Sequence, residues 1–438
     1  MFILSAFLNF SICVTIFLVF LKYEKSFSVY SPLFAYLAFH LFVFILWPLI
    51  SGAYGYSKIY DKMGISPNNS LLIRTHCATL VGLLFFTIGY YLVTAGRNWT
   101  RGSFEKKFPL DNSFSLLVIV LSLCFPLILY SIVYSVRAGH NVSFVDGKGI
   151  VEQGSGYLLD AQNMAIGMSL LLLLCRSSFK IGVSLLVVFI IGRMLQGYGR
   201  QMLLFAILVP IVFYFLRKRI RFPSTRVGLV IVLSVLLVYP AFVALGAFRD
   251  GGKVLLGLKD ESSYAEFRRK DGVDYRDNQD FANFQYLTYI IDTVPDLSGD
   301  YSYGIQHLMV FLEPVPRKIW PEKPTSLVEW NLNDYGNFLG LTPSMVGDGW
   351  MSGGFIGVSV TMLIWGAFSG MIYRHWCLDN GNLLQLILYS IFITVSIIWY
   401  RDGEVTSLVK KFLILSLPVF IFVLLRCGWK LLKVDVKL

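Results

Sequence analysis

Long apolar stretches dominate the chain, and they limit its fold more than any other feature does. About 20 consecutive apolar residues suffice for a helix to cross a bilayer. We predict eleven such spans, at residues 2–21, 31–51, 71–94, 114–136, 157–175, 180–196, 201–216, 227–248, 353–373, 383–400 and 406–425. The run from 180 to 216 can be one span or two, and we divide it because one helix of that length would be too long. The sequence thus predicts an all-α, polytopic membrane protein.

The composition agrees with this class and gives the cysteines no special role. Hydrophobic residues make up 56% of the 438 residues and charged ones 15%, which excludes an ordinary soluble domain. The six cysteines lie in apolar runs or beside their ends, without metal-ligand or disulfide spacing. We interpret them as small hydrophobic residues of the core: Cys13, Cys77, Cys124, Cys175, Cys377 and Cys427.

Basic residues in the short loops predict the orientation, because cytoplasmic loops carry an excess of Lys and Arg. Alternate loops hold 18 of them, at 22–30, 95–113, 176–180, 217–226, 374–382 and 426–438. With eleven spans, the N-terminus is then outside and the C-terminus is inside. The first span has no basic residue before it and Lys22 after it, so we expect it to be retained rather than cleaved.

The spans divide the chain into three parts: eight spans in 1–248, one large polar loop at 249–352, and three spans with a short tail in 353–438. The loop is predicted to be external and holds 16 acidic and 10 basic residues, whereas the whole chain has a net charge of +11. The overall basicity therefore reflects membrane topology and does not indicate nucleic-acid binding. Within the loop we expect a short amphipathic helix, Tyr303 to Leu312.

Several charged residues lie on the predicted outer face, where arginine is disfavoured. Arg200 lies in the tight turn between two apolar spans, and Arg249 ends the eighth span. Arg401 and Asp402 lie at the outer end of the tenth span, and Glu404 follows them closely. Charge retained against this tendency marks candidate functional residues. The alternative is that each arginine reaches lipid phosphate, an explanation that loses weight when three converge on one face.

Lys410 and Lys411 follow in the last span. Counted from Arg401, they lie about 14 to 15 Å along a helix. At that depth a lysine is expected to face a cavity, an acidic partner or a bound anion. If the helix instead begins well above the membrane, the pair is interfacial.

The block Glu313 to Pro324 combines four prolines with Trp320 and three cations, Arg317, Lys318 and Lys323. Proline fixes φ and removes amide donors, so we expect a rigid corner that holds its cations in place. Such a corner suits a phosphorylated, lipid-borne headgroup. Trp320 fits this role or the aromatic belt of a membrane protein.

Further candidates lie elsewhere in the loop. Asp348 precedes the Gly353–Gly354 entry to the ninth span, and His307 follows Gln306 in the expected short helix. Asp271, Asp274, Asp277 and Asp280 recur every three residues, but without an EF-hand pattern we read them as solvated and predict no metal site.

In several of these motifs the chain resembles the Wzy-type polymerases of O-antigen and related oligosaccharide repeat units. The resemblance rests on Gly199–Arg200, on the run 316–324 (PRKIWPEKP), on Thr342–Pro343 leading to Gly347, and on Arg401–Asp402–Gly403, where relatives often carry Glu as the acid. It covers roughly residues 195–410. Membership would imply a metal- and cofactor-independent glycosyltransferase of the GT-C type in the bacterial inner membrane. It would also imply a periplasmic active site and glycans on undecaprenyl pyrophosphate as substrates.

The residues can be matched to that chemistry. Fixed guanidinium groups neutralise the charge that develops on a departing diphosphate. For this role we choose Arg200, Arg249 and Arg401, with Arg317 as a further candidate, and Lys410 and Lys411 for a second diphosphate. The attacking hydroxyl needs a proton acceptor, for which the candidates are Asp402, then Asp348, then Glu404. Asp402 has the alternative role of orienting Arg401.

Two other functions remain open at this stage. An O-antigen ligase shares the general plan and uses a loop histidine, a role that His307 fits. A flippase or transporter of lipid-linked glycans also carries intramembrane cations, but it usually shows related halves, which this sequence lacks. For the polymerase, a chain-length regulator and a flippase are the expected protein partners.

Overall fold

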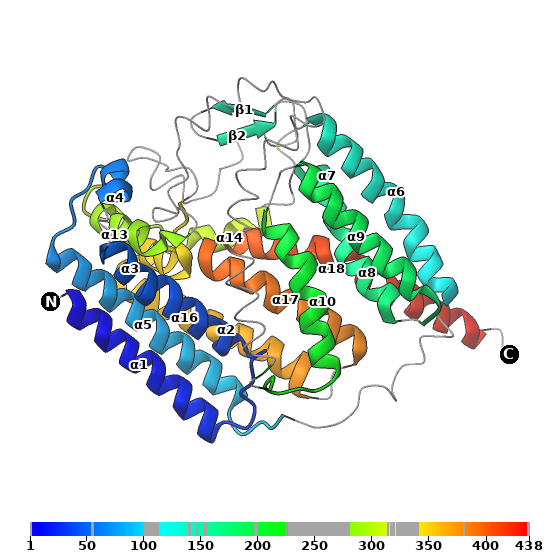
Figure 1. The fold of residues 1–438 in the computed structure, drawn as a ribbon, viewed down its shortest axis with the longest axis horizontal. Coiled ribbons are helices and arrows are strands. Elements are labelled where there is room, and N and C mark those ends of the chain that lie inside the picture. Colours follow the sequence, from blue (N-terminus) through cyan, green and yellow to red (C-terminus); the bar gives the residue numbers. More distant parts are fainter. Residues whose placement is uncertain are drawn as a thin grey trace. The chain divides into compact units, whose positions relative to one another are not determined.

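The structure is a computed structural model. It describes residues 2–53, 57–99, 114–138, 142–145, 148–151, 156–174, 176–196, 200–224, 226, 281–312, 315, 320, 341–379 and 382–435. Long apolar helices make up most of these residues (Figure 1). The predicted fold class, a helical polytopic membrane protein, is confirmed.

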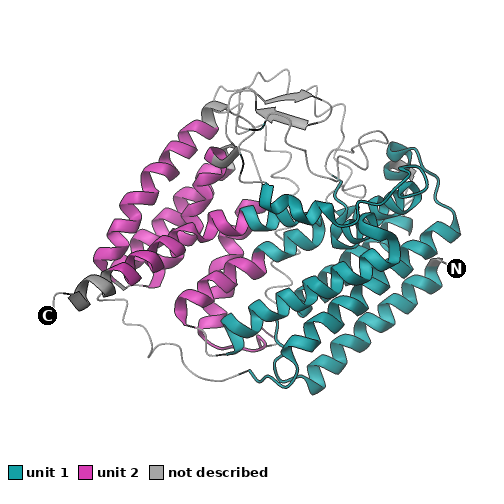
Figure 2. Ribbon diagram, turned by 180° about the vertical axis from the view of Figure 1, so that it is seen from behind, with its two compact units in different colours: residues 1–100, 274–380, 395–410 teal, residues 101–273, 381–394, 411–438 magenta. Residues whose placement is uncertain are grey.

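The chain forms two compact units, each assembled from three stretches (Figure 2). Unit 1 comprises residues 1–100, 274–380 and 395–410, and unit 2 comprises 101–273, 381–394 and 411–438. The residues that form the candidate functional site in the structure all belong to unit 1.

The described part of unit 1 contains six elements that precede the polar loop and four that belong to it or follow it. The elements are α1 (Phe2–Tyr23), α2 (Pro32–His40), the π-helical turn η1 (Leu41–Leu46), α3 (Trp47–Ala53), α4 (Ser57–Met63), α5 (Asn69–Thr94), α13 (Asn283–Thr293), α14 (Ile305–Leu312), α16 (Ser344–Tyr373) and the π-helical turn η7 (Arg374–Leu378). It also holds the end of α17 (Leu383–Asp402) and the start of α18 (Val405–Asp435). The helix expected at 303–312 is therefore found as α14.

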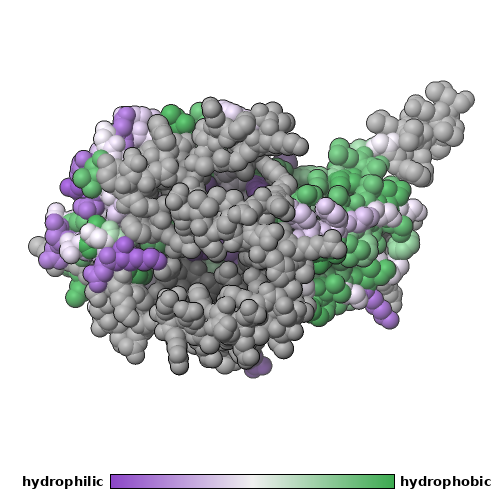
Figure 3. Space-filling model, turned by 90° about the horizontal axis from the view of Figure 1, so that it is seen from above, coloured by the Kyte–Doolittle hydropathy of each residue, from purple (hydrophilic) through white to green (hydrophobic). Residues whose placement is uncertain are grey.

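Unit 2 contains the remaining elements, with largely apolar exposed surfaces. These are α6 (Phe114–Ala138), β1 (Val142–Val145), β2 (Lys148–Val151), α7 (Gly156–Asp160), η4 (Ala161–Asn163), α8 (Met164–Leu174), η5 (Arg176–Ser178), α9 (Phe179–Gln196), α10 (Arg200–Arg217) and most of α17 and α18. Leu123, Leu127 and Tyr130 of α6 are all about half exposed. Hydrophobic side chains likewise dominate the described surface at the right of Figure 3. Such a surface suits contact with lipid.

Seven of the described helices are long and apolar enough to cross a membrane: Ile3–Tyr23, Pro32–Gly52, Asn69–Thr94, Phe114–Ser135, Ser344–Leu378, Leu383–Asp402 and Val405–Gly428. The predicted spans 157–175 and 201–216 correspond to shorter apolar helices, Leu158–Leu174 and Gln201–Arg217. The run 180–216 holds two helices, α9 and α10. The predicted span 227–248 lies outside the described residues.

A short β-hairpin was not expected from the sequence. Strands β1 and β2 pair antiparallel, with Val142 opposite Val151 and Val145 opposite Lys148. A usable signal was present, because Asp146–Gly147 separates two short runs rich in β-branched residues, a typical hairpin pattern.

Helices α5 and α16 form the centre of unit 1. They run parallel, since Gly82 lies against Met362 while Gly370 lies against Tyr90. A side chain at Gly89 or at Gly366 would collide with the backbone of the other helix. Glycine allows such close approach of membrane helices, so this pair fixes the register of unit 1.

The two ends of unit 1 differ in their charged residues. At the end where α5 and α16 finish, Asp379 accepts from Arg97 Nη1 at 3.4 Å and from Arg374 Nε at 3.2 Å. Both arginines belong to loops that the sequence assigns to the cytoplasm. The candidate residues Asp348 and Arg401 lie near the opposite end, where α16 begins and α17 ends.

Candidate functional site

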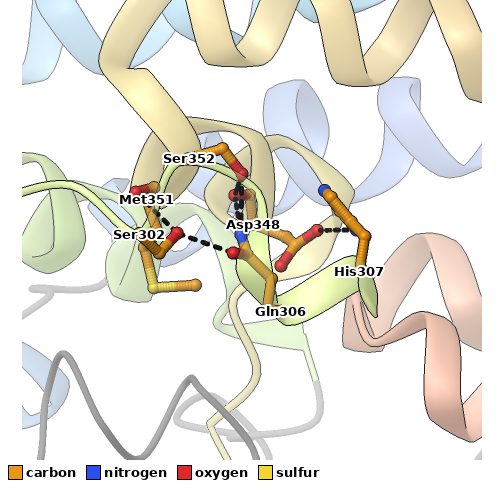
Figure 4. A network of polar contacts seen from close by, with 6 residues as sticks. All are labelled: Ser302, Gln306, His307, Asp348, Met351 and Ser352. Carbon is orange, nitrogen blue, oxygen red and sulfur yellow. Dashed lines mark hydrogen bonds and ion pairs between the residues drawn. The ribbon is translucent and has the colours of Figure 1, made fainter. Parts of the chain in front are cut away.

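A buried carboxylate and an imidazole face each other at this opposite end of unit 1. His307 of α14 places its Nδ1 3.4 Å from Oδ2 of Asp348, which lies in the first turns of α16 (Figure 4). The Asp348 side chain is 4% exposed and the His307 side chain 22% exposed. A carboxylate removed from water is stabilised by a partner of this kind. The two residues, 41 positions apart in the chain, therefore form one acid–base unit.

Neighbouring hydrogen bonds hold α14 on α16. Gln306 Nε2 donates to Ser352 Oγ at 2.6 Å and to the carbonyl oxygen of Asp348 at 3.1 Å. Ser302 Oγ lies 2.6 Å from Gln306 Oε1, and the Ser302 amide donates to the carbonyl oxygen of Met351 at 2.8 Å. Figure 4 shows these groups around the pair. The network fixes the position of His307 relative to Asp348.

Aromatic rings border the imidazole on another side. His307 makes an edge-to-face contact with Trp365, with ring centroids 6.0 Å apart. Trp365 in turn contacts Trp399 of α17 at 4.8 Å, also edge to face. These rings limit the movement of the imidazole, and they give the pair one apolar wall.

Both nitrogens of His307 lack a hydrogen bond that meets normal geometry within the described part of the chain. Nδ1 is committed to Asp348 by its position, although at 3.4 Å the contact is longer than a good hydrogen bond. Nε2 has no partner of its own there. The long contact does not exclude a role in proton transfer, since catalytic hydrogen bonds are often long before substrate binds.

The Arg401–Asp402–Gly403 triplet forms the turn between α17 and α18. Arg401 Nη1 lies 3.7 Å from Asp402 Oδ1, and both side chains are more than four-fifths buried. Gly403 has a φ of +79°, and a Cβ there would collide with the carbonyl oxygen of Ser344 and lie 3.3 Å from Asp348 Cβ. The turn therefore packs directly against the segment that carries Asp348.

α16 bends beside this segment. Gly354 has a φ of +60°, a value that favours glycine, and a Cβ at that position would lie 3.0 Å from the Tyr301 hydroxyl. Burial raises the pKa of the Tyr301 phenol, and nearby Asp296 raises it further while Arg74 lowers it. Arg74, exposed in the first turns of α5, is thus a cation near this end that the sequence analysis did not select.

Several other predicted site residues lie elsewhere or outside the described residues. Arg249, Arg317, Lys318 and Lys323 are outside them, as are the four aspartates of the series from 271 to 280. Arg200 begins α10 in unit 2, and its side chain is not described. The convergence of Arg200, Arg249 and Arg401 on one pocket stays a prediction. Trp320 is 38% exposed.

The lysine pair lies closer to the start of its helix than predicted. Helix α17 continues to Asp402, and α18 begins only at Val405. Lys410 is therefore about 8 Å along its helix, rather than 14 to 15 Å. Lys410 and Lys411 are both half-buried, and Glu404 precedes the helix, its carbonyl oxygen accepting from the Leu408 amide at 3.3 Å. Whether the pair is interfacial or deep in the membrane stays a prediction.

The described residues contain no group of three or more His, Cys, Asp or Glu side chains placed to hold a metal ion. Three polar residues that connect these elements were not predicted from the sequence: Asn283, Ser302 and Gln306. All three are uncharged residues in a polar loop, where composition and spacing carry no sign of their partners.

Comparison with known proteins identifies one match. The model of the family described as O-antigen polysaccharide polymerase Wzy matches residues 1–433, essentially the whole chain. Comparison with curated proteins and with solved structures gives no match. The match extends well beyond the roughly 195–410 on which the resemblance in the sequence rested.

Proposed function

The chain belongs to the family of O-antigen polysaccharide polymerases Wzy, and on this premise we propose that it joins undecaprenyl-pyrophosphate-linked oligosaccharide repeat units into a polysaccharide. Members of this family act on lipid-linked oligosaccharide repeat units in the membrane. The observation that carries the mechanism is the buried His307–Asp348 pair beside the turn of Arg401.

The proposed reaction is a glycosyl transfer. A hydroxyl oxygen of the incoming repeat unit forms a bond to the anomeric carbon of the growing glycan. The bond from that carbon to the diphosphate oxygen breaks, and undecaprenyl pyrophosphate leaves with the electron pair. The hydroxyl proton passes to a base on the enzyme, so the balance requires no redox partner.

His307 is the proposed proton acceptor, with Asp348 as its orienting partner. Nδ1 faces the carboxylate, which leaves Nε2 to take the proton, and the carboxylate stabilises the imidazolium that forms. This refines the ranking from the sequence, in which Asp402 stood first and Asp348 second as the base. Asp348 keeps a role in proton transfer, through the histidine.

Asp402 is assigned to the arginine instead. Its carboxylate lies 3.7 Å from Arg401 Nη1, which supports the orienting role that the sequence analysis left open. Arg401 is proposed to neutralise the charge that develops on the leaving diphosphate. Arg200 and Arg249 are proposed for the same task, with Arg317, Lys318 and Lys323 in headgroup binding.

The reaction is proposed to take place on the periplasmic side of the bacterial inner membrane, without metal ion or cofactor. The basic residues Arg97 and Arg374 at the opposite end of unit 1 support this orientation, with the N-terminus periplasmic and the C-terminus cytoplasmic. A chain-length regulator and a flippase are proposed as partners, because a polymerase needs its units delivered and its product length set.

The test uses the purified full chain with lipid-linked repeat units. The proposal predicts a ladder of glycan lengths, which Arg200→Ala, Arg249→Ala and Arg401→Ala should each abolish at unchanged abundance in the membrane. Transfer of glycan to lipid A core instead would make the protein a ligase. Movement of the lipid across vesicles without new glycosidic bonds would make it a flippase.

A further inference from the structure

Helix α13 is a short helix of the polar loop that is enclosed by unit 1. Every residue of α13 except Asp292 is buried, and the helix contacts α5, α16, η1 and α4. Its first residue, Asn283, is 2% exposed. A polar side chain at such a position must find partners within the protein.

The Asn283 amide has three acceptors within reach. Nδ2 lies 2.8 Å from the carbonyl oxygen of Thr342, 3.0 Å from Thr342 Oγ1 and 2.8 Å from the carbonyl oxygen of Arg401. Carbonyl oxygens only accept, so the amide nitrogen must face them, and the orientation of the side chain is fixed by chemistry. The Oδ1 atom has no hydrogen-bond partner within the described ranges. The side chain therefore contributes as a donor.

These bonds act on the end of α17. The carbonyl groups in the last turn of a helix have no partner within the helix. The Arg401 carbonyl is satisfied from two sides, by Asn283 and by Thr342 Oγ1, which donates to it at 3.1 Å. The Asn283 side chain thus ties the end of α17 to the segment that precedes α16.

That connection reaches the candidate site directly. Two residues after Arg401, Gly403 packs on the backbone of Ser344 and beside Asp348. A shift of the end of α17 would therefore move Arg401 relative to the His307–Asp348 pair. Because Gly403 lies so close to the Ser344 backbone, the turn has little room to shift without moving that backbone as well.

We propose that Asn283 is a positioning residue, which fixes the Arg401 turn against the His307–Asp348 pair so that the cation and the base act on the same substrate. This inference rests on the proposed function. Displacing a catalytic group by about 1 Å can cost about a hundredfold in rate, and such a loss falls on turnover rather than on substrate binding.

The test is Asn283→Asp, which keeps the size of the side chain but turns its donor group into an acceptor facing two carbonyl oxygens. The matched control is Asn68→Asp. Asn68 caps α5 by accepting from the Leu71 amide at 2.8 Å, a bond that aspartate also makes. Initial rates of the first elongation step are measured over a range of concentrations of lipid-linked repeat unit.

We expect Asn283→Asp to lower the kcat of the folded protein by about tenfold to a hundredfold, while KM stays near that of the wild type. Its thermal unfolding midpoint in detergent should fall, because the new carboxylate is buried against two carbonyl oxygens. Asn68→Asp should match the wild type throughout. On an Arg401→Lys background, Asn283→Asp should cause little further loss, because both changes disturb the same cation. Wild-type kcat in Asn283→Asp, or losses that multiply on the Arg401→Lys background, would overturn the inference.

A second variant covers the case in which Asn283→Asp does not fold. Thr342→Val removes the hydroxyl that donates to Arg401 but keeps the shape of the side chain, and it should lower kcat by a smaller factor with the same dependence on Arg401→Lys. An unchanged kcat there would also overturn the inference. A wild-type protein that forms no glycan ladder would refute the proposed function itself, whereas a normal ladder with active Asn283 and Thr342 variants refutes only this positioning role.

Discussion

Replacing Asp348 by asparagine removes one charge from the buried pair and leaves its shape almost unchanged. Opposite unit charges separated by the 3.4 Å between His307 Nδ1 and Asp348 Oδ2 attract by about 5 kcal/mol at an effective dielectric constant of roughly 20. This attraction appears when His307 gains the proton, so it stabilises the transition state more than the ground state. Since about 1.4 kcal/mol corresponds to tenfold in rate, the upper limit of the loss is between about 10³-fold and 10⁴-fold. We expect about 10³-fold in kcat for Asp348→Asn.

The assay is the initial rate of the first elongation step with purified protein in detergent or nanodiscs. Asp300→Asn is the matched control, because Asp300 is exposed in the same loop. Its Oδ1 accepts from the Tyr301 amide at 2.8 Å, and asparagine retains that bond. Its rate should equal that of the wild type. The thermal unfolding midpoint of Asp348→Asn should not fall greatly, because asparagine removes a charge that is costly to bury.

A rate within about threefold of the wild type for Asp348→Asn would refute the reasoning, because an attraction of this size cannot be lost without effect. An equal loss in Asp300→Asn would also refute it, since any change of charge in the loop would then produce the effect. Loss of folded protein in Asp348→Asn alone would assign the pair a structural role.

Three further predictions concern the turn and the helix pair. Gly403→Ala should destabilise the protein by about 1 to 3 kcal/mol, because Gly403 has a positive φ and a Cβ there would collide with the neighbouring backbone. The control Gly428→Ala, in an open helical position, should leave the stability unchanged. Equal thermal midpoints of the two variants would contradict this prediction. Gly366→Val should reduce the yield of folded protein, because the backbone of α5 lies directly against Gly366. The control Gly192→Ala, in open space, should express normally. Equal yields in size-exclusion chromatography would argue against the close packing. Arg401→Lys should retain part of the elongation activity that Arg401→Ala loses, since lysine keeps the charge but not the two-pronged contact; equal rates of the two variants would remove the case for bidentate binding.

The helical framework follows from the sequence because membrane spans depend on local properties. A stretch of about 20 apolar residues must satisfy its backbone hydrogen bonds internally, and a helix does so from its own residues. The ninth predicted span, 353–373, illustrates the limit of this reasoning. It coincides with the part of α16 after the bend at Gly354, but α16 begins nine residues earlier, at Ser344. That first part packs inside the unit, and its polarity resembles that of a loop.

Helix α13 shows why elements of the polar loop are harder to predict. Polar residues such as Asn283, Gln285 and Thr288 are buried in it. Gln285 Nε2, for example, donates to Ser51 Oγ at 3.1 Å, across 234 residues of sequence. The pattern of residues within the helix cannot predict a hydrogen-bond partner so distant in the sequence. The burial of α13 is therefore a tertiary property.

The candidate site, too, could be predicted from the sequence only in part. Asp348, Arg401 and His307 could be selected as charged or titratable residues in unusual positions. Their pairing could not, because the Asp348–His307 contact depends on how α14 lies on the start of α16. Selection by residue type placed Asp402 first as the base, whereas in the structure its Oδ1 lies 3.7 Å from Arg401 Nη1.

The rate of elongation by the wild type and by His307→Ala tests the central claim most directly. Purified protein is mixed with one radiolabelled lipid-linked repeat unit and an excess of unlabelled units, and glycan lengths are resolved on a gel. The account predicts a ladder for the wild type and a loss of about a thousandfold or more in its rate for His307→Ala, at equal thermal midpoints. A ladder formed at the wild-type rate by His307→Ala would contradict the assignment of His307 as the proton acceptor.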